Sequence, residues 1–185
     1  MPPQPAGIWN SVYNDSKWTD ATGPDRYRRA IYTFVKRTAG YPSSLIFDAS
    51  DRDTSLPRRI ATNTPLQALV TLNDPVYQEA AQALARRVIK DTATKASGDS
   101  TGDSVLDARL VYETRLVLSR DPTAHELAQL RAFYKDAIKM PKPALVKASM
   151  NLSPESAGRK VAGSELEALT AVGSILFNLD AALVR

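Results

Sequence analysis

The side chains best suited to chemistry lie in one polar stretch, residues 43–57, which contains three aspartates. Asp51, Asp53 and Ser55 alternate as the first ligands of a calcium loop do, but the glycine of the sharp turn and the distal glutamate are missing. The sequence therefore predicts no metal site here. We expect Asp48, Asp51 and Asp53 to accept backbone N–H bonds in turns and to neutralise nearby arginines.

Two functional interpretations of these carboxylates stay open at this point. The first is a site for an anion or an acidic ligand. Its candidate binding residues are Arg28, Arg29, Asp48, Arg58 and Arg59. The second is an enzyme that combines the three aspartates with His125, the only histidine of the chain. A histidine base needs a partner that orients it, and no recognisable triad accompanies His125, so we expect an exposed first-turn residue and assign no catalytic residue.

The chain carries a net charge of +4, and many of its basic residues are neighbours in the sequence. The adjacent pairs are Arg28 and Arg29, Lys36 and Arg37, Arg58 and Arg59, and Arg86 and Arg87. If the pairs met on one face they would attract a polyanion such as an acidic polysaccharide, and Trp9 and Trp18 could stack on its sugar rings. Because the excess is modest and the pairs lie on separate elements, we expect a mixed surface instead. The sequence has no helix-turn-helix, zinc-finger or RNA-binding motif, so nucleic acid is not an expected partner.

The chain contains no cysteine, and this absence excludes several classes of site. Disulfide bonds, thiolate metal sites and haem attached through a Cys-x-x-Cys-His motif all require cysteine. We therefore expect no cofactor in this chain. No apolar run is long enough to span a bilayer, and the first residues show no signal-peptide pattern. Residues 1–5 are instead typical of an interdomain linker.

Capping side chains followed by proline mark two helix starts in close succession. The runs Asn63-Thr64-Pro65 and Asn73-Asp74-Pro75 place hydrogen-bonding side chains directly before a residue that suits the first helical turn. Thr123 and Ser164 each stand three residues before a glutamate, which is the spacing of a capping box. The predicted cap residues are Asn63, Asn73, Asp74, Thr123 and Ser164.

The predicted fold class is mainly α, a single irregular helical domain with about five helices and long loops. The helices are expected to begin near Pro65, Pro75, Ser104, Thr123 and Ser164. At most a little β structure is expected in the N-terminal third, since residues 27–38 fit either a strand or a short helix. Residues 1–25 should form a linker-like segment that packs by its aromatic rings, and residues 26–185 a helical domain with a flexible loop at 91–103. Gly173 and its small neighbours should let another helix approach the last helix closely.

Three segments carry a resemblance to a known family. They are residues 62–88 (TNTPLQALVTLNDPVYQEAAQALARRV), residues 27–37 with Phe47-Asp48-Ala49, and residues 176–180 (LFNLD). The chain resembles the C-terminal domain of unknown function of large multidomain proteins that carry planctomycete-type cytochrome c domains. One departure follows Asp180, where the resemblance would place Glu-Phe and this chain has Ala181 and Ala182.

The resemblance implies a setting for the chain. It implies an exported protein, located outside the cytoplasm, in which haem c belongs to other domains and the partners are those domains of the same polypeptide. The favoured function is a non-catalytic structural or interaction module at the C-terminal end of that protein. The first alternative is a binding domain for an acidic polysaccharide or other polyanion, and the second is an enzyme that uses the carboxylate cluster.

Overall fold

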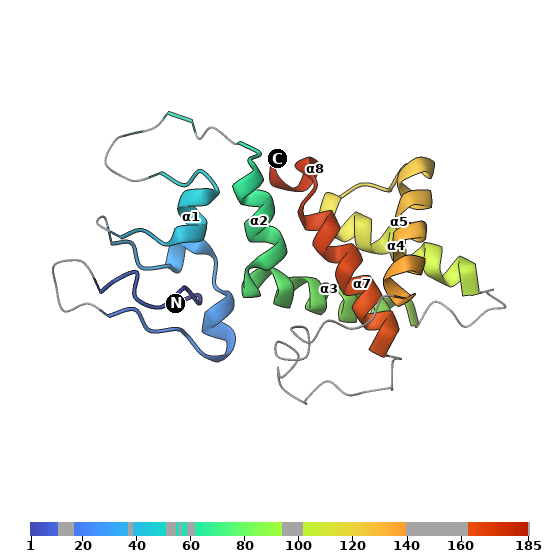
Figure 1. Ribbon diagram of the computed structural model, residues 1–185, viewed down its shortest axis with the longest axis horizontal. Coiled ribbons are helices and arrows are strands. Elements are labelled where there is room, and N and C mark those ends of the chain that lie inside the picture. The colour runs from blue at the N-terminus through green and yellow to red at the C-terminus, as the bar shows by residue number, and fades with distance from the viewer. Residues whose placement is uncertain are drawn as a thin grey trace. The chain divides into compact units, whose positions relative to one another are not determined.

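A computed structural model describes residues 1–10, 17–36, 39–50, 55, 57–58, 62–93, 102–139 and 163–184. The chain forms two compact units, residues 1–67 and residues 68–185. Figure 1 shows the chain coloured from the N-terminal to the C-terminal end.

The prediction of a mainly α-helical fold is confirmed. The described residues contain seven α-helices and two short 3-10 helices, and no strand occurs among them. Two of the α-helices, α1 (Pro42–Ile46) and α8 (Asp180–Leu183), are single turns that the sequence did not signal. The segment that fitted either strand or helix begins with the last residue of the 3-10 helix η1 (Gly23–Tyr27) and contains the 3-10 helix η2 (Ala30–Tyr32), so Tyr27, Ile31 and Tyr32 lie in tight turns.

The first unit packs around an indole ring. Trp9 is buried, with its ring centroid 5.2 Å from that of Trp18 and 5.6 Å from that of Phe34. Trp18 in turn stacks on Tyr41 at 5.7 Å. Each indole N–H finds an acceptor, since Trp9 donates to the Ala39 carbonyl at 3.2 Å and Trp18 to the Pro2 carbonyl at 3.1 Å. The aromatic rings of residues 1–25 therefore pack against residues beyond position 25, and the compact unit extends to Gln67.

Helix α2 (Pro65–Asn73) begins with a reciprocal capping box. The Gln67 N–H donates to Thr64 Oγ1 at 3.3 Å, and the Thr64 N–H donates to Gln67 Oε1 at 2.9 Å. The capping residue is thus Thr64 rather than the predicted Asn63, because Pro65 is the first helical residue and Thr64 directly precedes it. The box spacing of Thr64 and Gln67 was visible in the sequence.

Helix α3 (Pro75–Ala93) begins where α2 ends. Asp74 caps it, with Oδ1 accepting the Val76 N–H at 2.8 Å. Asn73, also predicted as a cap of this start, instead turns back and donates from Nδ2 to the Leu69 carbonyl at 2.8 Å. Asn73 therefore serves the C-terminal end of α2, where carbonyl groups lack helical partners.

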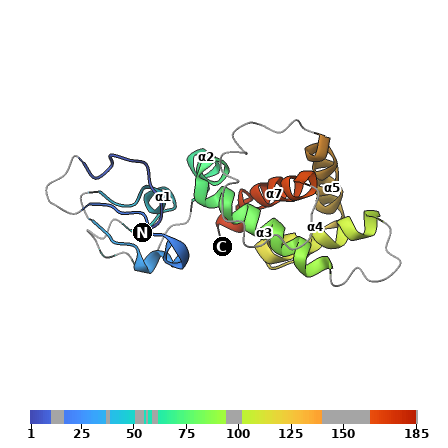
Figure 2. The ribbon, with the colours of Figure 1, turned by 90° about the horizontal axis from the view of Figure 1, so that it is seen from below.

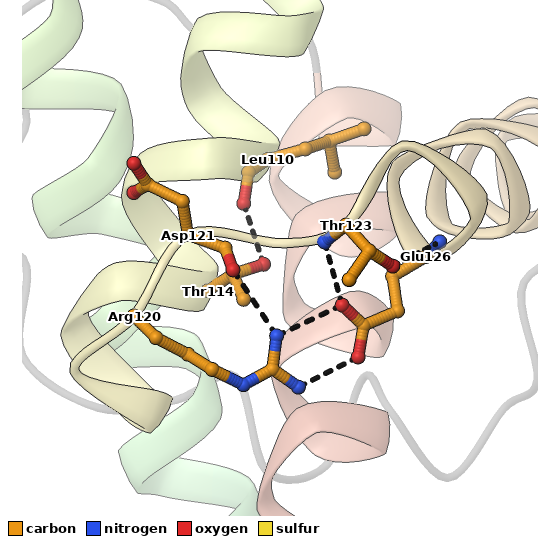
Figure 3. A network of polar contacts seen from close by, with 6 residues as sticks. All are labelled: Leu110, Thr114, Arg120, Asp121, Thr123 and Glu126. Carbon is orange, nitrogen blue, oxygen red and sulfur yellow. Dashed lines mark hydrogen bonds and ion pairs between the residues drawn. The ribbon is translucent and has the colours of Figure 1, made fainter.

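Helices α4 (Gly102–Leu118) and α5 (Ala124–Lys139) meet at a turn fixed by charge (Figure 3). Thr123 and Glu126 form a second capping box, with the Thr123 N–H donating to Glu126 Oε2 at 2.7 Å and the Glu126 N–H to Thr123 Oγ1 at 3.2 Å. Arg120 donates to both Glu126 oxygens, at 2.8 and 2.6 Å. The Arg120 guanidinium, followed by the Thr123 N–H, lowers the pKa of Glu126 to about 2.

Helix α7 (Gly163–Phe177) lies centrally in the second unit and contacts α3, α4, α5 and α8 (Figure 2). Its inward side chains, Leu169, Val172 and Leu176, are fully buried. The predicted close approach occurs at Gly173, where a Cβ atom would lie 3.6 Å from Ala81 Cβ of α3. Ser164 lies in the first turn of α7, and its side chain is outside the described residues.

The predicted loop at 91–103 is helical at both ends. Helix α3 continues to Ala93 and α4 begins at Gly102, and residues 94–101 lie outside the described residues. Thr92 is buried and donates to the Val88 carbonyl at 2.7 Å, while Asp91 accepts the Tyr112 hydroxyl at 2.8 Å. The first bond lies within α3 and the second links α3 to α4. Together they stabilise the last turn of α3, in a stretch whose small polar residues favour a loop. Within the described ranges, no helix has the length and apolar character needed to cross a bilayer.

Candidate functional site

Arg28 and Arg29, the first arginine pair of the candidate binding site, lie on the surface of the first unit between its 3-10 helices. Arg28 donates from Nε to Asp25 Oδ1 at 2.8 Å, and its guanidinium carbon lies 5.7 Å from the ring centroid of Tyr32. Both side chains of the Arg28–Asp25 pair are mostly exposed, so the pair contributes only about 0–1 kcal/mol to stability. Arg29 is also exposed and directly precedes η2.

Asp48, the carboxylate of the predicted binding site, lies in a different environment. It has a positive φ of 57° at the end of α1, and its Oδ2 accepts the Thr62 N–H at 2.8 Å. Gln67 is buried, and its Nε2 reaches the Ile46 carbonyl at 2.9 Å, Thr62 Oγ1 at 3.2 Å and Asp48 Oδ2 at 3.3 Å. The carboxylate thus joins the end of α1 to the start of α2, which is a structural task within the first unit.

The remaining residues of the tentative sites do not form a cluster in the described part of the chain. Arg58 is exposed, while Arg59, Asp51 and Asp53 lie outside the described residues. His125 is exposed on the first turn of α5, in the second unit. Among the described side chains, no group of three or more histidines and carboxylates could hold a metal ion.

The two tryptophans, which were expected to pack within the fold and offered a sugar-stacking platform only as an alternative, are engaged inside the first unit. Trp9 is buried beneath Trp18, Phe34 and Lys36, whose ammonium nitrogen lies 4.7 Å from the Trp9 ring centroid. Lys36 itself is buried, so this member of the basic pairs supplies a cation to the ring and not to the surface. A sugar ring therefore has no access to the faces of Trp9.

The mostly apolar composition of helix α2 suggests that its leucines are buried, but the structure exposes them and buries polar side chains. Its buried side chains are polar, Gln67 and Thr71, each 1% exposed. Its three leucines are exposed, Leu66 by 55%, Leu69 by 57% and Leu72 by 40%. Gln67 and Thr71 are four residues apart and the leucines three apart, so the two sets occupy opposite faces of the helix. The sequence pattern locates both faces but does not say which one is buried.

Glu113 on α4 was not among the site residues predicted from the sequence. Its side chain is completely buried. Neither of its carboxyl oxygens has a hydrogen-bond partner among the described residues. Burial raises its pKa from 4.5 to about 8, so the carboxyl group is neutral at pH 7. The helical spacing from Leu106 and Leu110 places Glu113 on the buried stripe of α4, and that spacing is the signal that could have found it.

Comparison with protein families identifies one match. A family model described as PSD1, protein of unknown function (DUF1553), matches residues 1–134. These residues include Asp48, the start of α2 and the arginines at 28 and 29, and they leave out α7 and the terminal residues 176–180. No curated protein and no solved structure matches the chain. Because the match covers well over half of the sequence, the chain belongs to the PSD1 family of proteins of unknown function.

Proposed function

We propose that the chain is a non-catalytic interaction module of a larger exported protein. In this proposal the leucine face of α2, defined as Leu66, Leu69 and Leu72, docks on an apolar surface of a neighbouring domain of the same polypeptide. The observation that carries the proposal is the orientation of α2, which buries a glutamine and a threonine and exposes three leucines.

The buried polar side chains of α2 are satisfied where they are. Gln67 Nε2 donates to the Ile46 carbonyl at 2.9 Å, and Thr71 Oγ1 donates to the Ala68 carbonyl at 3.0 Å. Turning the helix to bury the leucines would break the Gln67 bonds and leave their partners unpaired, at about 1–3 kcal/mol for each buried group. The leucine face is therefore held outward by the fold, as an interaction surface requires.

The size of the leucine face favours a partner in the same polypeptide. Full burial of a leucine contributes about 1.5–3 kcal/mol, and these three side chains are already roughly half buried, so docking would add about 3 kcal/mol in all. A dissociation constant of about 1 mM already requires about 4 kcal/mol, so the leucines alone would not hold a separate protein. A domain linked to the chain is present at an effective concentration on the order of millimolar, so the leucine contact, which alone corresponds to a dissociation constant of about 6 mM, would hold it together with a few further contacts, whereas a separate protein at micromolar concentration would stay unbound.

The proposed location of the module and the identity of its neighbouring domains rest on the family resemblance of residues 62–88 and 27–37. We infer that the neighbouring domains carry haem c, that the protein acts outside the cytoplasm, and that any redox chemistry belongs to those domains. The chain would then position its neighbours and would react with nothing itself.

The proposal is tested in the longer protein that contains this chain. The triple substitution of Leu66, Leu69 and Leu72 to serine should release the module, which small-angle X-ray scattering would detect as a larger radius of gyration. Ile138→Ser is the matched control, because Ile138 is a comparably exposed aliphatic residue on α5. Equal scattering curves for the triple variant and the unaltered protein would refute the proposal.

The isolated chain provides a check on the premise. Because Leu69 is 57% exposed, the buried part of its side chain contributes about 1 kcal/mol, and Leu69→Ser should lower the free energy of unfolding by only about that much in urea titrations. A loss above about 2 kcal/mol, the scale of a truncated core side chain, would show that the leucine face is packed within the chain itself.

A further inference from the structure

A second surface, on the first unit, differs from the leucine face in both charge and composition. It consists of two kinds of side chain within residues 26–34, the arginines and the large apolar residues. We call it the arginine–aromatic surface, and its members are Arg26, Tyr27, Arg28, Arg29, Ile31, Tyr32 and Phe34. We propose that this surface binds an acidic peptide segment that also carries apolar side chains.

The large apolar side chains of this surface are mostly exposed to solvent. Ile31 is 79% exposed, and Tyr27, Tyr32 and Phe34 are each more than half exposed. Single exposed apolar side chains scattered over a surface need no explanation, but these four lie within residues 27–34 and their number suits an interaction site. The apolar atoms would therefore gain free energy from contact with a partner's side chains.

The backbone beneath the surface is held in place. The Tyr32 N–H donates to the Arg29 carbonyl at 2.9 Å and the Thr33 N–H to the Ala30 carbonyl at 2.9 Å, which closes the turn of η2. The Phe34 ring packs on the buried Trp9 ring. Because the segment is ordered before binding, a ligand would lose little affinity to the ordering of this surface.

The charge of the surface is positive. Residues 23–35 contain three arginines and one aspartate, a net charge of +2. The aspartate, Asp25, pairs with Arg28 at 2.7 Å, and both side chains are mostly exposed. Such a pair is weak in water, so a carboxylate of a ligand can share or replace it. Arginine also offers a planar fork of donors that matches a carboxylate.

A hollow beside Arg28 sets the size of the group that enters. Its lining includes Arg28, Tyr32 and Thr33 from this segment and Pro2, Ala21 and Asp25 from around it. Its volume of about 210 Å³ is below the roughly 300–1,000 Å³ typical of small-molecule sites. The hollow fits one side chain of a peptide, with the rest of the peptide lying across the exposed apolar groups.

Two observations favour a peptide over an acidic polysaccharide. The most exposed member of the surface is the aliphatic Ile31, and a glycan has no apolar side chain to cover it. Trp9, the ring best suited to stack on a sugar, is buried. An acidic peptide supplies both the carboxylates and the apolar side chains that the surface calls for.

The probe for this proposal is a fluorescein-labelled nonapeptide of alternating aspartate and leucine, and the measurement is fluorescence anisotropy with the intact chain. We expect saturable binding that Arg28→Gln with Arg29→Gln weakens about ten-fold and that added salt also weakens. Ile31→Ser should weaken binding about three-fold or more, because an exposed apolar contact is lost.

The matched control is the double substitution Arg86→Gln with Arg87→Gln, which removes an arginine pair that is also exposed, from α3, and should leave the affinity unchanged. The proposal is overturned if the probe shows no saturable binding or if the control pair weakens it as much as the pair at 28 and 29. It is also overturned if a heparin oligosaccharide binds at least as tightly and Ile31→Ser has no effect, since the surface would then be a general polyanion site. None of these outcomes involves the leucine face of α2, so this proposal can fail while the proposed function stands.

Discussion

The buried carboxyl group of Glu113 gives this protein an unusual dependence of stability on pH. Glu113 is fully buried in α4, and a Cβ atom at Gly173 of α7 would lie only 3.0 Å from its Oε1. The other neighbours at that point, Ala81 and Leu84 of α3, are apolar. No described residue bonds the Glu113 carboxyl oxygens, and burial raises the pKa of this group to about 8.

The direction of the effect follows from the two protonation states. In the unfolded chain the carboxyl group titrates near 4.5, and in the folded chain near 8. The folded state therefore holds its proton over a range in which the unfolded state loses it, and stability falls as the pH rises through this range. The contribution is fully present below pH 4.5 and is lost by about pH 8.

The size of the effect can be stated as an order of magnitude. Each pH unit between the two pKa values corresponds to about 1.4 kcal/mol, so the interval from 4.5 to about 8 corresponds to about 5 kcal/mol. Native domains are stable by only about 5–15 kcal/mol. Ionisation of this one group would therefore remove a large fraction of the free energy of unfolding.

The assay is urea unfolding of the wild-type chain and of Glu113→Gln at intervals from pH 5 to pH 9. Glutamine keeps the shape and stays neutral, so the variant should gain about 4–5 kcal/mol relative to the wild type across this range. The control is Glu126→Gln, because the pKa of Glu126 is lowered to about 2 and its carboxylate stays ionised throughout. Parallel stability curves for the wild type and Glu113→Gln would refute the reasoning, since they would mean that the carboxylate is ionised in the folded protein.

Two further substitutions test the contacts that build the fold. Thr64→Ala should destabilise the chain by about 0.5–2 kcal/mol in urea titrations, because it removes the capping bond to the Gln67 N–H, and Asn63→Ala should cost clearly less; equal losses would return the cap to Asn63. Gly173→Ala should lower the melting temperature, because the new methyl group would lie 3.0 Å from Oε1 of the fully buried Glu113 and the cost of about 1–3 kcal/mol should exceed the roughly 1 kcal/mol that alanine gains over glycine in a helix; an unchanged or raised melting temperature would show that the Glu113 side chain moves aside.

The helical framework could be predicted from local signals in the sequence. Proline after a capping residue marked α2 and α3, and the Thr123–Glu126 box marked α5, each within a residue of its observed start. These signals are local because they satisfy N–H groups of the first turn with side chains a few residues away. The end of α3 was missed because it depends on α4, where Tyr112 bonds Asp91 across a gap of 21 positions.

The environment of single side chains could not be predicted in the same way. Asp48 was expected to accept a backbone N–H bond, and it does, but nothing in the sequence identifies its partner as Thr62, 14 positions later. Glu113 stands on a stripe of leucines, and its sequence neighbours do not show that α3 and α7 enclose it. Burial depends on which segments pack against each other, and the local patterns of a single sequence do not reveal that packing.

In helix α2, the sequence sets which face is apolar, and the polar contacts of Gln67 determine that this face is exposed. The Gln67 amide is drawn into the first unit by the Ile46 carbonyl, Thr62 and Asp48, and its bond with Thr64 also fixes the helix start. With Gln67 facing inward, the 100° rotation per residue leaves the three leucines no inward position. The described polar residues that precede α2 thus hold Gln67 inward and leave the leucine face exposed, which is the orientation on which the proposed docking rests.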